Sequence, residues 1–143
     1  GWACWKTYLG RPDTDGVRCI SMGALGNGLR EWRPNEALPV LEAELSLLRR
    51  YWSHDEKATI NTQSNLASCL ADLERHDEAL VLHREIYARA VAALGVSHKY
   101  AIMSGTNVAQ NLFMLRHFDE AVALLRDQLL PVARQSLGAD SDV

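Results

Sequence analysis

A string of residues that occurs twice is the feature that most constrains how this chain folds. Residues 64–79 read SNLASCLADLERHDEA, and residues 106–121 read TNVAQNLFMLRHFDEA. Equivalent residues lie 42 positions apart, as Asn65 and Asn107 do. Self-similarity at a fixed period of roughly 20 to 50 residues is the sequence signature of a repeat array. We therefore expect one small structural unit to recur along the chain.

Each copy has the pattern of two helices. Apolar and small residues recur at helical spacing within residues 55–74, and a short polar break follows. Asp77 is placed to cap a second helix, and Gly95 is placed to end it, because glycine readily adopts the left-handed conformation of a helix stop. The unit is thus predicted to consist of a helix, a tight turn, a second helix and a stop.

The same pattern continues toward the C-terminus. Residues 98–116 repeat the first helix and residues 119–137 repeat the second, with Gly138 as the expected stop. The two Leu-Gly stops lie 43 positions apart, from Gly95 to Gly138, so the last unit has one extra residue. Pro131 falls inside the last helix, where it lacks an amide donor and is expected to kink the helix.

Small residues mark the places where the two helices of a unit are expected to cross closely. They are Gly26, Ala67 and Ala109 in the first helices, faced by Ala37, Ala79 and Ala121 in the second. A leucine at any of these positions would overpack the crossing at a cost of about 1–3 kcal/mol. This order of large and small residues resembles the signature of tetratricopeptide repeats over nearly the whole chain.

The 42-residue period is similar to that of the longer, kinesin light chain type of tetratricopeptide repeat. The strings NLASCL and NVAQNL, each followed by an Asp-Glu-Ala run, resemble its elements. HDEKAT at residues 54–59 resembles its His-Pro-x-x-Ala-Thr start, with Asp55 in place of proline. Tyr51-Trp52-Ser53 stands where a Leu-Gly stop is expected, which indicates a divergent array.

The resemblance implies an all-α fold, an α-solenoid of antiparallel helix pairs. We expect about three repeats, with six main helices and an N-terminal half-helix, in a single domain. Its parts are the tail of a preceding repeat (1–10), three units (about 11–52, 53–95 and 96–138) and the start of a following repeat (139–143).

Charge and composition exclude several classes of function. The net charge is −3 and the pI about 5.9, so no basic excess exists to neutralise phosphates, and nucleic-acid binding is not expected. The sequence has no run of 18 apolar residues and no charged-then-apolar leader, so we expect a cytoplasmic protein that does not bind membranes. Its three cysteines are odd in number and far apart, which fits a reducing compartment.

Catalytic and metal-binding patterns are missing from the sequence. Five histidines are present, but no His-x-x-x-His or Cys-x-x-Cys pair supports a metal site. His76 and His83 are seven residues apart and have the spacing to share a helix face. Ser64, Ser68 and Cys69 have no histidine three or four residues further on. We therefore expect no enzyme activity, no metal and no cofactor.

The tetratricopeptide resemblance implies a role for two asparagines. In that family the first helices line a concave groove, and an asparagine at the place of Asn65 and Asn107 commonly holds the backbone of a bound peptide. An amide suits this role because it offers both a donor and an acceptor. The further residues expected to contact the peptide are Asn27, Asn61, Ser68 and Gln110.

Other interpretations of these helices stay open at this point. Asn65 and Asn107 would, in the alternative, brace neighbouring helices. Met103 and Met114 share the face of Asn107 and fit the groove and the core equally well. Gly28 costs about 1 kcal/mol relative to alanine inside a helix, and nothing in the sequence explains it.

Two functions are consistent with these patterns. The first is a non-catalytic module that binds an extended peptide segment of a partner protein in its groove. The second is an architectural or self-associating arm of a larger protein with zinc-finger or enzymatic domains, where any self-association would use the ends of the array. The aromatic residues Trp2, Trp5 and Tyr8 motivate the second function.

Overall fold

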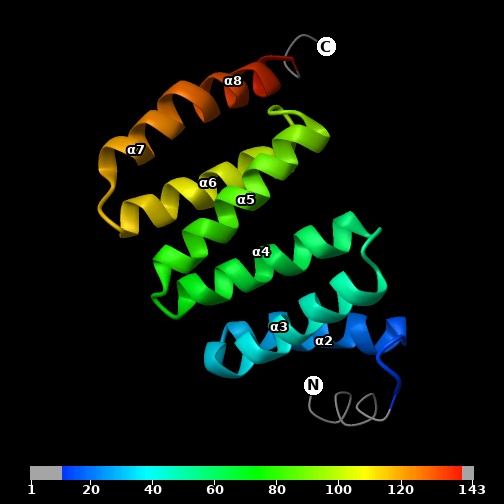
Figure 1. Ribbon diagram of the computed structural model, residues 1–143. Helices are drawn as coiled ribbons and strands as arrows, with labels where there is room; N and C mark the ends of the chain where they lie inside the picture. Colours follow the sequence, from blue (N-terminus) through cyan, green and yellow to red (C-terminus); the bar gives the residue numbers. More distant parts are fainter. Residues whose placement is uncertain (1–10, 140–143) are drawn as a thin grey trace. The chain divides into compact units, whose positions relative to one another are not determined.

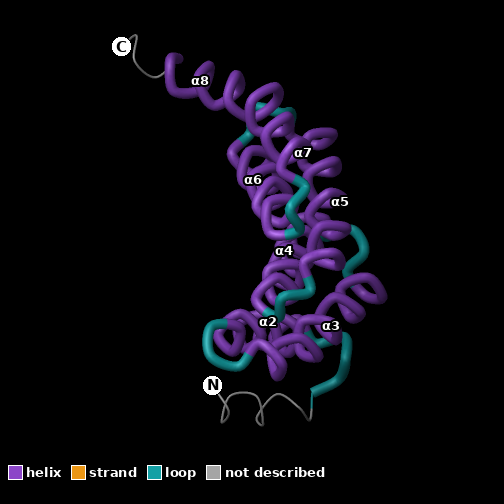
Figure 2. Tube along the Cα trace, turned by 90° about the vertical axis from the view of Figure 1, so that its left-hand side faces the viewer, coloured by secondary structure: helices purple, strands orange, loops and turns teal. Residues whose placement is uncertain are grey.

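The computed structural model describes residues 11–139 of the 143-residue chain, and every regular element in that range is a helix (Figures 1 and 2). The chain divides into two compact units, of which the first ends at Arg75 and the second begins at His76. The expectations for residues 1–10 and 140–143, including the half-helix, lie outside the described residues. The division into three repeat units stays a prediction.

Three helices build the first unit: α2 (Gly16–Arg30), α3 (Pro34–Tyr51) and α4 (Glu56–Asp72). Asp15 caps α2, because its carboxylate accepts a hydrogen bond of 2.8 Å from the backbone N–H of Val17. Asp55 caps α4 in the same way, 2.9 Å from the N–H of Ala58. Pro34 begins α3, where its fixed φ suits the first turn and its missing N–H costs nothing.

Helices α2 and α3 lie side by side and cross at a glycine (Figure 1). Gly26 is buried on α2, and a Cβ built there would lie only 2.6 Å from Cδ2 of Leu41 on α3. Ala37, one turn before Leu41, is fully buried as well. The close crossing predicted for Gly26 is therefore confirmed.

The second unit starts with α5 (His76–Leu94) and α6 (Lys99–Met114), followed by α7 (Phe118–Ala123), the π-helical turn η1 (Leu124–Leu129) and α8 (Leu130–Ala139). Helix α5 ends at Gly95, whose φ of 85° is left-handed, as the sequence predicts. The His98 ring caps α6 by accepting a hydrogen bond from the N–H of Tyr100. The core of this unit contains Leu80, Val108, Leu112 and Ala121.

Two predicted helix boundaries are wrong by two residues. Helix α5 begins at His76, so Asp77 lies inside the first turn, where its charge complements the helix dipole, and is not the cap. Helix α8 continues through Gly138 to Ala139, so that glycine is not a stop. A glycine ends a helix only where it takes a positive φ, and among the described residues Gly95 is the glycine that does so.

The disturbance expected at Pro131 takes the form of a π-helical turn. In η1, just before the proline, the backbone N–H of Leu130 bonds to the carbonyl of Leu125, five residues back. Proline has no N–H to donate and its ring crowds the carbonyl four residues earlier, so the preceding turn widens. The other small residues predicted at the helix crossings are also buried: Ala67, Ala79, Ala109 and Ala121.

Candidate functional site

The α4 face is the side of α4 formed by Asn61, Asn65, Ser68 and Asp72. These residues are three or four positions apart, so their side chains lie one above the other. Asn61 and Asp72 are exposed, and Asn65 and Ser68 are half-buried. Within residues 11–139, the Asn65 side chain takes part in no hydrogen bond, so its amide is available to a ligand.

Asn27 lies on α2, in the same compact unit as the α4 face, and is exposed. Three residues further along α2, Arg30 forms an ion pair with Asp72, with 3.3 Å between Nε and Oδ2. This pair joins the C-terminal ends of α2 and α4. The structure thus places the helix that carries Asn27 next to the α4 face.

The α6 face is the corresponding side of α6, formed by Met103, Asn107, Gln110 and Met114. Met103 is 58% exposed and Met114 is 53% exposed, so the interpretation of these methionines as core residues is wrong. Gln110 is exposed and Asn107 is half-buried. In the described part of the chain the Asn107 side chain, like that of Asn65, forms no hydrogen bond that would brace a neighbouring helix.

A polar group lies behind the α6 face, and the sequence analysis missed one of its three members, Asn111. We call it the Asn111 cluster, and it consists of His76 and His83 on α5 and Asn111 on α6. His83 and Asn111 are each only 3% exposed. Their side chains connect the two helices near the C-terminal end of α6.

The Asn111 amide takes part in three hydrogen bonds. Its Nδ2 donates to the carbonyl oxygen of Asn107 at 2.8 Å and to Nδ1 of His83 at 2.9 Å. Its Oδ1 accepts a hydrogen bond from Nδ1 of His76 at 3.2 Å. The carbonyl of Asn107 only accepts, so it fixes which atom of the amide is the nitrogen.

The orientation of Asn111 determines the protonation state of both histidines. Because Nδ2 donates to His83, Nδ1 of His83 must be unprotonated, and the ring is neutral with its hydrogen on Nε2. Nε2 of His83 is buried and has no partner within the described residues. Burial also lowers the pKa of His83 to about 4, which favours the same neutral form.

A buried acid is a second group that the sequence analysis missed. Glu44 on α3 is buried between Leu41 and Leu45, and its Oε2 has no partner in the part of the chain that the structure describes. Burial raises the pKa of Glu44 to about 7, although a hydrogen bond with Thr62 of α4 acts in the opposite direction. This carboxyl group therefore titrates near neutral pH.

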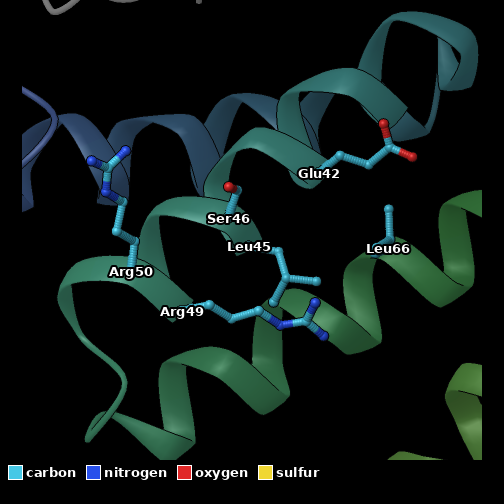
Figure 3. A pocket seen from close by; sticks show the side chains of 6 residues that line it. All are labelled: Glu42, Leu45, Ser46, Arg49, Arg50 and Leu66. Carbon is cyan, nitrogen blue, oxygen red and sulfur yellow. The ribbon is translucent and has the colours of Figure 1, made fainter.

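An open pocket of about 490 Å³ lies between α3 and α4 (Figure 3). Its lining residues are Glu42, Leu45, Ser46, Arg49, Arg50 and Leu66. Figure 3 shows the Arg49 side chain extending past Leu45, while the Arg50 guanidinium lies over the ring of Tyr51 at 5.1 Å. None of the predicted peptide-binding residues lines this pocket, so it is separate from the α4 face.

The described residues contain no group of three or more His, Cys, Asp and Glu side chains placed to hold a metal ion. Among the helices in this range, none combines the length and the apolar character that crossing a bilayer requires.

Comparison with known proteins identifies the repeat type. A family model described as tetratricopeptide repeat matches residues 58–129, whereas no curated protein matches the chain. Among solved structures, the chain is similar to one from Podosopora anserina described as kinesin light chain nearly identical TPR-like repeats, with a TM-score of 0.74, 18% identity and 87% of this chain covered. A variant of that protein gives a TM-score of 0.75, 18% identity and 88% coverage.

The similarity to these structures concerns the fold. The identity of 18% is too low to transfer a function, and this chain spans 59% of the length of either structure. The expected fold class, an all-α α-solenoid built of antiparallel helix pairs, is confirmed by this likeness together with the helices described above.

Proposed function

Because the chain belongs to the tetratricopeptide repeat family, we propose that it is a non-catalytic module that binds an extended peptide segment of a partner protein. Repeats of this family mediate protein–protein interaction. Asn65 on the α4 face and Asn107 on the α6 face are each proposed to hold the backbone of such a segment.

The observation that carries this proposal is the state of the two asparagines. Asn65 and Asn107 occupy equivalent positions 42 residues apart, are half-buried, and make no side-chain hydrogen bond within the described residues. An amide with an unused donor and acceptor on a helix face matches the alternating N–H and C=O groups of an extended chain. Neighbouring positions offer selectivity through Asn27, Asn61, Ser68 and Gln110.

A peptide-library screen on the purified chain tests this proposal. Peptides that bind the chain are remeasured with a variant that combines Asn65→Ala and Asn107→Ala, and we expect at least about a tenfold loss of affinity, as two hydrogen bonds to buried backbone groups predict. Asn35→Ala is the matched control, because Asn35 is exposed on α3, outside both faces. Unchanged binding constants in the double variant would show that the asparagines do not hold the ligand.

A second candidate function, an architectural or self-associating arm, is favoured by exposed aromatic side chains. Phe113 and Phe118 are both exposed and pack edge-to-face with ring centroids 5.2 Å apart, and Trp32 is also exposed. Light scattering over a concentration series measures self-association directly. A mass that stays at one chain over the whole series would exclude the self-associating form of this proposal.

A further inference from the structure

The two units contain the same junction between helices, built from different side chains. In the second unit, His83 of α5 and Asn111 of α6 meet in a buried hydrogen bond. The equivalent residues 42 positions earlier are Leu41 and Cys69, which are both buried. The first unit therefore folds with a leucine and a cysteine at these two positions, so packing alone does not require the polar pair His83 and Asn111.

Asn111 also makes more hydrogen bonds than Cys69, its equivalent in the first unit. Cys69 makes a single hydrogen bond, from Sγ to the carbonyl of Pro34 at the start of α3. Asn111 contacts the equivalent first residue of α5, His76, and in addition bonds His83 and the backbone of Asn107. Asn107 is the residue that we propose to hold the peptide, so the cluster lies directly behind the proposed site.

We propose that His83 is a proton-sensitive link between α5 and α6. When its ring is neutral, His83 holds Asn111 and the turn of α6 from Asn107 to Asn111. When the ring is protonated, His83 releases them. A proton on Nδ1 turns the acceptor of the Asn111 bond into a donor, so that two N–H groups face each other. Asn111 cannot turn its amide over to compensate, because its Nδ2 is also needed by the carbonyl of Asn107.

No charged group on α6 lies near the link to stabilise the protonated ring. The titratable residues of α6 are Lys99 and Tyr100, both in its first turn, which is about 18 Å along the helix from Asn111. The other ring of the cluster, His76, donates through Nδ1 in its neutral form and in its cationic form alike. Protonation of His76 therefore leaves its own bond to Asn111 intact.

The remaining charged residues in the described part of the second unit are exposed, apart from the half-buried Arg89. On α7, Glu120 pairs with Arg84 of α5 at 2.9 Å and with His117 at 3.3 Å. In η1, Arg126 pairs with Asp127 at 2.6 Å. The other charged residues of α5 and α7 are Asp77, Glu78, Glu85, Arg89 and Asp119. Burial is the one cause of the lowered pKa of His83, and no acid offsets it.

Acidification is therefore expected to open α6. A histidine with a pKa of about 4 when buried and 6.5 when exposed shifts the opening equilibrium about 20-fold toward the open form between pH 7 and pH 5. Peptide binding through Asn107 would weaken over the same range. That last consequence rests on the proposed function, whereas the link itself does not.

Hydrogen exchange and NMR of the full chain, without peptide, test the link. We expect the His83 ring to show a hydrogen on Nε2 and none on Nδ1 at pH 7. Exchange rates corrected for their intrinsic pH dependence should show the α6 amides opening about 20-fold more at pH 5 than at pH 7. A hydrogen on Nδ1 at pH 7 would overturn the proposal.

Three variants distinguish opening of α6 through protonation of His83 from a general effect of acid on the protein. His83→Asn keeps an acceptor at the place of Nδ1 but gains no proton, so its α6 opening should change less than about twofold between the two pH values. A double variant with His83→Leu and Asn111→Cys copies the first unit and should be equally insensitive. His54→Gln removes an exposed histidine and should behave like the wild type.

An unchanged 20-fold response in either of the first two variants would overturn the proposal. If His83→Asn does not fold, the double variant decides, because the residues that it copies, Leu41 and Cys69, are both buried in the first unit. Failure of the library screen would leave these results untouched, because no peptide takes part in them.

Discussion

The carboxyl group of Glu44 occupies the space that a side chain at Gly23 would need. A Cβ built on Gly23 would overlap Oε1 of Glu44, and the carboxyl carbon would be 2.9 Å away. The glycine on α2 thus makes room for a buried acid on α3. Because that acid has a raised pKa, the first unit carries a pH response of its own.

Glu44 is expected to make the protein less stable as the pH rises. Its pKa is about 7 in the fold and 4.5 in the unfolded chain, so folding favours the protonated form. The stabilisation is fully present below pH 4.5 and is lost as the pH rises through 7, by about 3 kcal/mol in total. Urea unfolding of the wild type and of Glu44→Gln over pH 4.5–8 measures this difference.

In the Glu44→Gln variant this loss should disappear, because an amide does not ionise. Both proteins contain His83, whose pH response has the opposite sign. The difference between their unfolding free energies therefore reports the pH response of Glu44 alone. A constant difference between them across the whole pH range would show that Glu44 stays ionised in the fold.

Two glycines of α2 are expected to respond to alanine with opposite signs. A methyl group at Gly26 would meet the buried Leu41 at 2.6–2.8 Å, so Gly26→Ala should destabilise by about 1–3 kcal/mol. Gly28 has no atom within 4 Å of the added carbon, so Gly28→Ala should stabilise by about 0.5–1 kcal/mol through helix propensity. Denaturant unfolding compares them, and a neutral Gly26→Ala would contradict the close crossing.

Asn107 and Asn111, one turn apart on α6, should differ in their effect on stability. Asn107→Ala should change the unfolding free energy by less than about 0.5 kcal/mol, because its side chain has no hydrogen bond in the described structure. Asn111→Ala should cost about 1–3 kcal/mol, since it leaves the buried Nδ1 of His83 without a donor. Equal costs measured by thermal unfolding would favour the bracing role for Asn107.

The two exposed methionines of α6 are expected to select the ligand. A variant with Met103→Asn and Met114→Asp copies Asn61 and Asp72 of α4 and should change stability by less than about 0.5 kcal/mol. In the library screen it should lose the preference for apolar side chains that exposed methionines give the wild type. Met22→Asn is the comparison, since Met22 is buried and should cost about 2–5 kcal/mol.

The helices and the exposed faces could be predicted from the sequence because they depend on local spacing. The stop at Gly95 and the burial of Ala67 follow from residue type and from the 42-residue period. Gly138 is also a glycine, but its φ is not positive, and the sequence does not show that Gly95 and Gly138 differ in this way. That conformation depends on the chain that follows the helix.

The buried polar groups could not be predicted in the same way. The bond between His83 and Asn111 joins residues 28 positions apart and exists only in one packing register of α5 and α6. Comparing the copies does offer a signal, since His83 stands where the first unit has the fully buried Leu41. Glu44 gives a similar signal, because it interrupts the apolar stripe of α3 between Leu41 and Leu45.

The π-helical turn η1 explains how the last repeat tolerates an inserted residue. Before the turn, the buried residues Ala79 and Ala121 are 42 positions apart; after its start, the buried Ile86 and Leu129 are 43 apart. In an uninterrupted α-helix one additional residue would rotate every later side chain by about 100° about the axis. The wide turn absorbs the insertion, so that the helix keeps its angular phase and returns Leu129 to the interior.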